Sequence, residues 1–252
     1  RHLMLDGEVF RTVSNQSWDP MVRVADMEQQ RIAHQVLSPM PELLAYWLEG
    51  ESAVSMTRFL NEQIAAMVAT APKHFTGLGT VPLQDMDRAI KELDHAVHEI
   101  GLAGVEVGSN VNGVPIGDPY FLPFFKAAES WGVAVFVHAL KPAGMDRLVG
   151  PPQLEHAVAY PTEIGLAAAS MITGGILDRC PRLRVAFSHG AGTLGQILPR
   201  LQHAWDIFPT LREHVLSRPE ELARRVFVDD LVYGADAIRF LISVFGDTQV
   251  MV

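Results

Sequence analysis

The sequence has little cysteine, no cluster of basic residues and no long apolar run. Cys180 is the single cysteine among 252 residues, so no disulfide can form within the chain, as is typical of a reducing compartment. The formal net charge of −9 argues against a nucleic-acid-binding surface. No apolar run reaches the roughly 18–20 residues of a membrane span, and no signal-peptide pattern is found. We therefore expect a cytoplasmic protein that neither binds nucleic acid nor spans a membrane.

Two further absences narrow the fold and the chemistry. The sequence has no stretch rich in proline, glycine and serine that would divide it, and its length suits one α/β barrel, so we expect a single domain over residues 1–252. A small hairpin insertion is expected at about residues 3–13, because Asp6-Gly7 supplies a tight turn. The pattern G-x-S-x-G is also absent, so a serine nucleophile has no support.

The rest of the chain alternates short β-branched runs with amphipathic stretches. This alternation predicts a parallel sheet with right-handed crossovers. A closed (β/α)₈ barrel needs eight strands. About seven are found, so we expect the first strand upstream of Arg1 and the end of the last strand beyond Val252. The expected strands are 34–37, 75–81, 104–107, 133–137, 185–187, 226–228 and 249–252, and the expected helices are 19–31, 52–71, 85–100, 118–131, 162–180, 193–207, 219–225 and 236–245.

Two of the predicted strands are each followed by a histidine, His138 and His189. The carboxyl ends of parallel strands are where α/β folds carry their chemistry. A single histidine in such a place is more often structural, but two after successive strands favour one metal-centred site. Asp229 and Asp230 end the next strand and are candidates for a supporting role at the same rim.

Five stretches stand in order along the chain: DGEVFR (Asp6–Arg11), TGLGTVP (Thr76–Pro82), FVH (Phe136–His138), SMITGG (Ser170–Gly175) and FSHGAG (Phe187–Gly192). Together they resemble the aminocarboxymuconate-semialdehyde decarboxylase group of the amidohydrolase superfamily. The resemblance implies a distorted (β/α)₈ TIM barrel, one zinc-type divalent ion and non-oxidative decarboxylation of an unsaturated or aromatic carboxylic acid. It also implies a homodimer.

The resemblance also assigns roles to individual residues. His138 matches a metal ligand after the fifth strand, His189 matches the acid/base that acts on metal-bound water, and Arg11 matches an arginine that binds a substrate carboxylate. The remaining ligands of the family, a His-x-His pair and an aspartate, have no counterpart here and are expected outside this chain. Zinc is the expected metal and manganese the second choice.

Two departures from the family pattern concern the substrate. Ala139-Leu140 stands where the family has Pro-Trp, and Phe208 aligns with a second carboxylate-binding arginine. These changes favour a related monocarboxylate or an aromatic acid over a dicarboxylated muconate.

Three other functions stay open at this point. The same metal site would serve a hydrolase of a lactone or a related bond, and a barrel without metal would only bind a partner. The stretch Gly190–Gly195 also reads G-x-G-x-x-G after a strand. However, no acidic residue ends a strand about 20 positions later, as dinucleotide binding requires.

Overall fold

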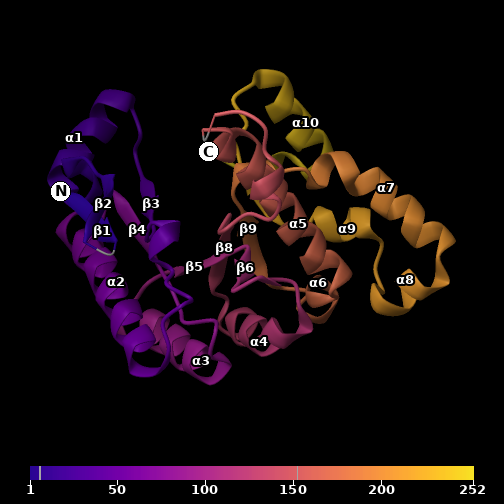
Figure 1. The fold of residues 1–252 in the computed structure, drawn as a ribbon, viewed down its shortest axis with the longest axis horizontal. Helices are drawn as coiled ribbons and strands as arrows, with labels where there is room; N and C mark the ends of the chain where they lie inside the picture. Colours follow the sequence, from indigo (N-terminus) through magenta and orange to yellow (C-terminus); the bar gives the residue numbers. More distant parts are fainter. Residues whose placement is uncertain (6, 152) are drawn as a thin grey trace.

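A curled parallel sheet forms the centre of the structure, a computed structural model that describes residues 1–5, 7–151 and 153–252 (Figure 1). Neighbouring strands are all parallel, and their spatial order follows the order of the sequence. The predicted alternation of strands and helices and the predicted barrel class are thus confirmed, with β3 and β11 as the two edges. The strands in the described part of the chain are β3 (Gln35–Leu37), β4 (Phe75–Gly79), β5 (Gly104–Gly108), β8 (Ala134–His138), β9 (Arg184–Phe187), β10 (Phe227–Asp229) and β11 (Val250–Met251).

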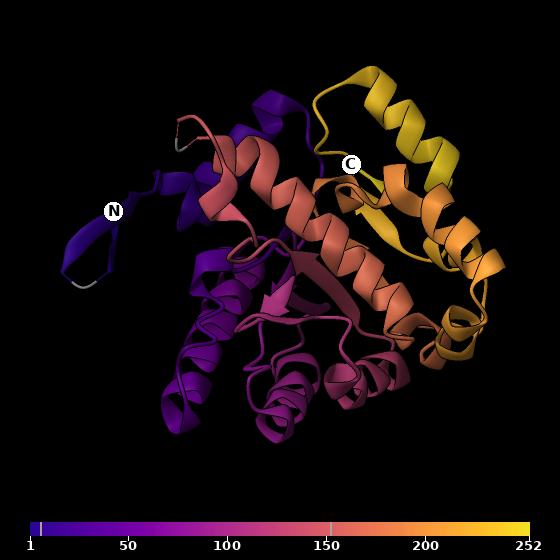
Figure 2. The same ribbon diagram turned by 45° about the vertical axis from the view of Figure 1, so that its right-hand side comes forward.

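Helices follow the strands and lie on the outside of the curl (Figures 1 and 2). The predicted start of the first helix is confirmed, because the Asp19 carboxylate accepts hydrogen bonds from the backbone of Met21 and Val22 at 3.0 and 3.2 Å. The described helices are α1 (Pro20–Gln30), α2 (Gly50–Thr70), α3 (Met86–Asp94), α4 (Leu122–Trp131), α5 (Tyr160–Thr173), α6 (Ile176–Arg179), α7 (Leu194–Ile207), α8 (Pro209–His214), α9 (Pro219–Ala223) and α10 (Ala235–Phe245). None of them combines the length and apolar character needed to cross a bilayer.

In the described part of the chain, two small antiparallel pairs lie outside the main sheet. The strands β1 (His2–Leu5) and β2 (Glu8–Thr12) form a hairpin that projects from the body in Figure 2. Asp6, which the sequence places in its turn, lies outside the described residues. The second pair, β6 (Asn110–Val111) and β7 (Val114–Pro115), follows β5 directly and was not expected from the sequence.

The two faces of the sheet differ because strand side chains alternate. One set of positions packs against the helices in a single apolar core; it comprises Val105, Val107, Val135, Val137, Val185, Phe187 and Val228. The other set points to the inside of the curl, and it includes Glu106, Phe136 and His138. The polar and aromatic positions of the inner set therefore meet on the concave side, where the candidate site is found.

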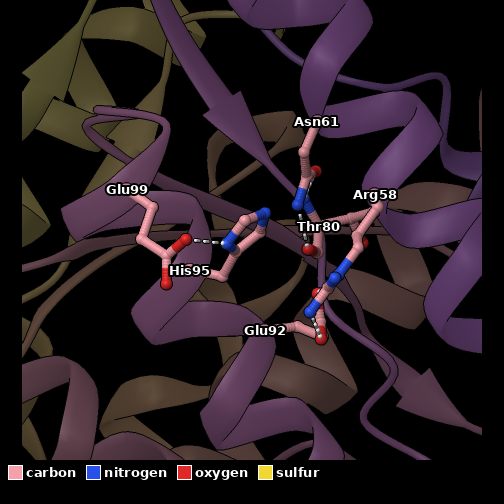
Figure 3. A network of polar contacts seen from close by, with 6 residues as sticks. All are labelled: Arg58, Asn61, Thr80, Glu92, His95 and Glu99. Atoms are coloured by element: carbon pink, nitrogen blue, oxygen red, sulfur yellow. Dashed lines mark hydrogen bonds and ion pairs between the residues drawn. The ribbon is translucent and has the colours of Figure 1, made fainter.

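Helix α2 is fastened to the sheet and to α3 by polar contacts (Figure 3). The Asn61 side chain donates to the Thr80 carbonyl at 3.0 Å and accepts from the Thr80 N–H at 2.7 Å. Arg58 forms two hydrogen bonds with the Glu92 carboxylate, at 2.8 and 2.9 Å. Gly79 leaves room for Asn61, since a Cβ there would lie 2.6 Å from its Oδ1. These contacts fix the carboxyl end of β4.

Several boundaries differ from the sequence-based expectations. The helix expected over residues 85–100 is α-helical only to Asp94 and continues as a π-helical turn, His95–Glu99. A second π-helical turn, Glu155–Ala159, leads into α5, so this helix begins before the expected Thr162. Pro161 lies at the junction between this π-helical turn and α5. Helix α8 was not expected, and short 3₁₀ turns complete the structure at Asn15–Ser17, Pro41–Leu43, Pro119–Phe121, Met145–Arg147, His189–Ala191 and Asp247–Gln249.

Candidate active site

His138 is the last residue of β8, and its ring orientation is fixed by its neighbour in sequence. The ring Nδ1 lies 3.1 Å from the carbonyl oxygen of Ala139. Because a carbonyl only accepts, Nδ1 must carry the hydrogen, which leaves a lone pair on Nε2. Burial lowers the pKa of His138, while the hydrogen bond to Ala139 and the charges of Asp229 and Glu42 oppose this change. The neutral imidazole is therefore favoured, and this is the form that binds metal ions.

His189 lies two residues after the end of β9 and beside His138. The two ring centroids are 5.4 Å apart, with an angle of 66° between the rings. The Nε2 atom of His189 is buried and has no hydrogen-bond partner among the residues that the structure describes. Burial lowers the pKa of His189, as does the charge of His138, whereas Asp229 raises it. An unsatisfied buried imidazole nitrogen is costly in a folded protein, so its presence points to a bound group or water at this position.

A tight turn, Ser188–Gly192, sets the direction of the His189 side chain. His189 has a φ of +52°, Gly190 of +61° and Gly192 of +57°. A Cβ at Gly192 would lie 1.8 Å from the Pro161 carbonyl oxygen, so only glycine allows this turn to pack against the start of α5. Such left-handed backbone is common where a strand end presents a functional side chain.

Tyr160, at the start of α5, stacks on the same imidazole. Its ring centroid is 6.2 Å from that of His189, and the rings are inclined by 27°. The Tyr160 hydroxyl donates to Glu155 Oε1 at 3.0 Å. Burial and this hydrogen bond raise the pKa of Tyr160 to about 12, so the phenol stays protonated. Sequence reasoning missed Tyr160, because nothing in its local pattern separates it from an ordinary residue at a helix start.

The loop after His138 is held by a buried carboxylate, Glu163 on α5. Its oxygens accept hydrogen bonds from the side chains of Ser109 and Asn110, at 2.8 and 2.9 Å, and from the Ala143 N–H at 3.0 Å. Ser109 in turn accepts from the Leu140 N–H at 3.0 Å. The ends of β5 and β8 are thereby joined. One signal was present in the sequence, since Glu163 falls on the apolar face of a helix.

Arg11 lies on β2, and its side chain is 41% exposed. Its Nη2 is 2.6 Å from Oε1 of Glu42, and its Nη1 is 3.7 Å from the sulfur of Met40. The charge of Arg11 lowers the pKa of Tyr160, opposing the larger effect of burial. The hairpin therefore brings this guanidinium within electrostatic range of the ring that stacks on His189.

The donor set for a metal ion is only partly present. Within residues 1–5, 7–151 and 153–252, no group of three or more histidine, cysteine, aspartate or glutamate side chains is arranged to hold a metal. The lone pair of His138 and the unpartnered Nε2 of His189 beside it nevertheless fit one metal ligand and one adjacent base. Asp229 supports the turn beside this pair, since its Oδ1 accepts hydrogen bonds from the N–H groups of Gly190 and Leu231.

Comparison with known proteins relates this chain to a family of enzymes and to individual relatives. A family model described as amidohydrolase matches residues 2–251. A 2-amino-3-carboxymuconate-6-semialdehyde decarboxylase from Dictyostelium discoideum is 38% identical over 251 residues, which cover 98% of this chain and 69% of that protein.

Two solved structures extend the similarity to the fold. The 5-carboxyvanillate decarboxylase from Sphingomonas paucimobilis has a TM-score of 0.78 and 27% identity, with 91% of this chain and 70% of that chain covered. The corresponding enzyme from Novosphingobium aromaticivorans has a TM-score of 0.79 and 25% identity, with 91% and 68% covered. The latter was solved with manganese and 4-hydroxy-3-methoxy-5-nitrobenzoic acid.

Proposed function

This chain belongs to the amidohydrolase family, and on that premise we propose that it catalyses metal-dependent, non-oxidative decarboxylation of an unsaturated or aromatic carboxylic acid. The observation that carries the proposal is the pair of imidazoles at the ends of β8 and β9, with centroids 5.4 Å apart. The relative in sequence and the two similar solved structures described above are all decarboxylases.

We propose that His138 binds the metal through Nε2, because its Nδ1–H is already committed to Ala139. A divalent ion bound there supplies Lewis acidity. Zinc is proposed first and manganese second; a relative's structure contains manganese. The further ligands are proposed to be the family's His-x-His pair and aspartate, which have no counterpart in this chain.

His189 and Arg11 have complementary roles in this proposal. His189 takes a proton from water at Nε2 and delivers it to the substrate carbon, whose bond to the carboxylate breaks with release of carbon dioxide. Tyr160 stacks on the imidazole and keeps its orientation. Arg11 binds the substrate carboxylate, since a guanidinium offers two parallel N–H donors to a carboxylate.

The function is tested by supplying the metal-loaded, full-length protein with unsaturated and aromatic acids and measuring the carbon dioxide released. We expect release from at least one acid and loss of release when the metal is removed by a chelator. Turnover that persists after complete metal removal would contradict the proposal, as would hydrolysis of lactones without any decarboxylation.

We further propose that the protein is a cytoplasmic homodimer. The single cysteine, Cys180, is buried and unpaired, which suits a reducing compartment. Ile207, Phe208 and Leu216 near the end of α7 and after α8 expose 51%, 55% and 74% of their surface, as expected for a contact between subunits. Light scattering on purified protein gives the oligomeric state directly.

A further inference from the structure

The proposed substrate-binding arginine is already joined to an anion of the same chain. Arg11 Nη2 and Glu42 Oε1 are 2.6 Å apart, and the two side chains are 41% and 27% exposed. Glu42 lies in the 3₁₀ turn that follows β3, whereas Arg11 comes from the projecting hairpin. A substrate carboxylate that approaches this guanidinium therefore also approaches the Glu42 carboxylate.

Glu42 is held in place by the segment that follows it. Leu44 and Tyr46 are buried in the main core. The Tyr46 hydroxyl accepts a hydrogen bond of 3.0 Å from the Gly108 N–H, and its carbonyl accepts one of 2.8 Å from the Asn112 side chain. The chain just after Glu42 is thus fixed against β5 and the β6–β7 hairpin.

The charge of Glu42 extends across the candidate site. Burial is the main influence on the pKa of His138 and of Tyr160, and Glu42 adds a rise to both. It also raises the pKa of Glu106 beneath the site, after the larger effect of burial. Glu42 is therefore within electrostatic range of His138, Tyr160 and Glu106.

We propose that Glu42 is a specificity-determining residue that selects substrates by charge. Arg11, with Glu42 as its fixed partner, accepts an acid with one carboxylate, and Glu42 repels a second carboxylate on the same substrate. The inference rests on the proposed function, because it requires that Arg11 binds the substrate carboxylate. Like charges a few ångströms apart in a partly buried site change affinity by about tenfold or more.

The test compares two acids that differ by one carboxylate, benzoate and benzene-1,3-dicarboxylate. Their dissociation constants are measured by calorimetry for the metal-loaded wild type, for Glu42→Gln and for Glu51→Gln. The last is the charge-matched control, since Glu51 is an exposed residue on α2 that pairs with Arg88. We expect the wild type to bind benzoate about tenfold or more tightly than the diacid. Glu42→Gln should lower this preference by about tenfold, and Glu51→Gln should leave it unchanged.

Several results would overturn the inference. The wild type could bind the diacid more tightly than benzoate. The ratio of the two dissociation constants could also stay unchanged in Glu42→Gln, or change by the same factor in Glu51→Gln as in Glu42→Gln. Failure of both acids to bind the wild type would also refute it, because Arg11 would then not be a carboxylate site. Thermal unfolding of each variant shows whether it is folded. Folded Glu42→Asp keeps the negative charge and should therefore keep the wild-type preference for benzoate. This experiment measures binding and not turnover. A protein that releases no carbon dioxide would therefore contradict the proposed function, while the ratio of the two dissociation constants would still decide the role of Glu42.

Discussion

The Asp229 carboxylate accepts a hydrogen bond of 2.8 Å from the backbone N–H of Gly190, the residue after His189. This contact joins the end of β10 to the turn that carries the proposed acid/base. The same carboxylate raises the pKa of both His138 and His189, against the larger lowering caused by burial. Asp229 therefore positions His189 and also tunes its proton affinity.

Replacing Asp229 by asparagine separates these two effects. Asparagine keeps an oxygen that can accept from Gly190 but removes the charge, so the pKa of His189 should fall further. Nuclear magnetic resonance titration of the histidine ring protons measures this change. Asp229→Ala should lower the pKa and also loosen the turn, seen as faster hydrogen exchange at Gly190. An unchanged or higher pKa in Asp229→Asn would refute the tuning role.

His138→Ala and His189→Ala should differ in their metal content. We expect His138→Ala to lose bound metal and activity together, because it removes a proposed ligand. His189→Ala should keep the metal and lose about 10²–10⁴-fold in turnover, the usual contribution of a general acid/base. Elemental analysis of both variants, alongside steady-state rates, makes the comparison. Equal metal loss in the two variants would show that the roles are assigned wrongly.

Replacing Glu163 by leucine should destabilise the protein strongly. The change leaves the Ser109 and Asn110 side chains and the Ala143 N–H without their common acceptor. We expect a loss of about 3 kcal/mol in the free energy of unfolding, measured by urea denaturation. Glu163→Gln, which keeps one accepting oxygen, should cost less. If Glu163→Leu lowered the free energy of unfolding less than Glu163→Gln, the network would not be what holds the loop after His138.

Most of the fold could be predicted because its signals are local. The β-branched runs that became β5, β8 and β9 are short and buried, and Asp19-Pro20 marks the start of α1 by its own chemistry. The π-helical turns could not be predicted, because their extra residue per turn depends on packing rather than on pattern.

The candidate site was predictable only in part, for a similar reason. His138 and His189 were found because the ends of parallel strands lie at one edge of a sheet. Glu42 and Tyr160 contact residues distant in sequence, and no local pattern records such contacts. Glu163 left one local sign, its place on the apolar face of a helix, but its partners Ser109 and Asn110 are likewise distant in sequence. Their roles became visible only when the chain was folded.

Glu106 gives a prediction about the pH dependence of stability. It points to the inside of the curl and is 1% exposed, and within the described part of the chain one of its oxygens, Oε1, has no hydrogen-bond partner. Burial raises the pKa of Glu106 from an ordinary value of 4.5 to about 8, with a smaller opposing effect from a hydrogen bond to Ser38. Below about pH 4.5 the group is protonated in both the folded and the unfolded protein. Between about pH 4.5 and 8, Glu106 ionises in the unfolded chain but stays protonated in the folded protein. The free energy of unfolding therefore falls over this window and levels off above it.

Glu106→Gln should remove this loss, because the amide stays neutral at every pH. We expect the variant to gain stability relative to the wild type as the pH rises from 5 to 8.5, by an amount on the order of a few kcal/mol. Urea denaturation at closely spaced pH values measures the difference. Glu51→Gln serves as the control, since its exposed side chain should show no such trend. A stability difference that stays constant across this range, or that shrinks towards alkaline pH, would mean that Glu106 is ionised in the folded protein. A partner for its free oxygen, such as a cation on the concave side of the sheet, would then have to be sought.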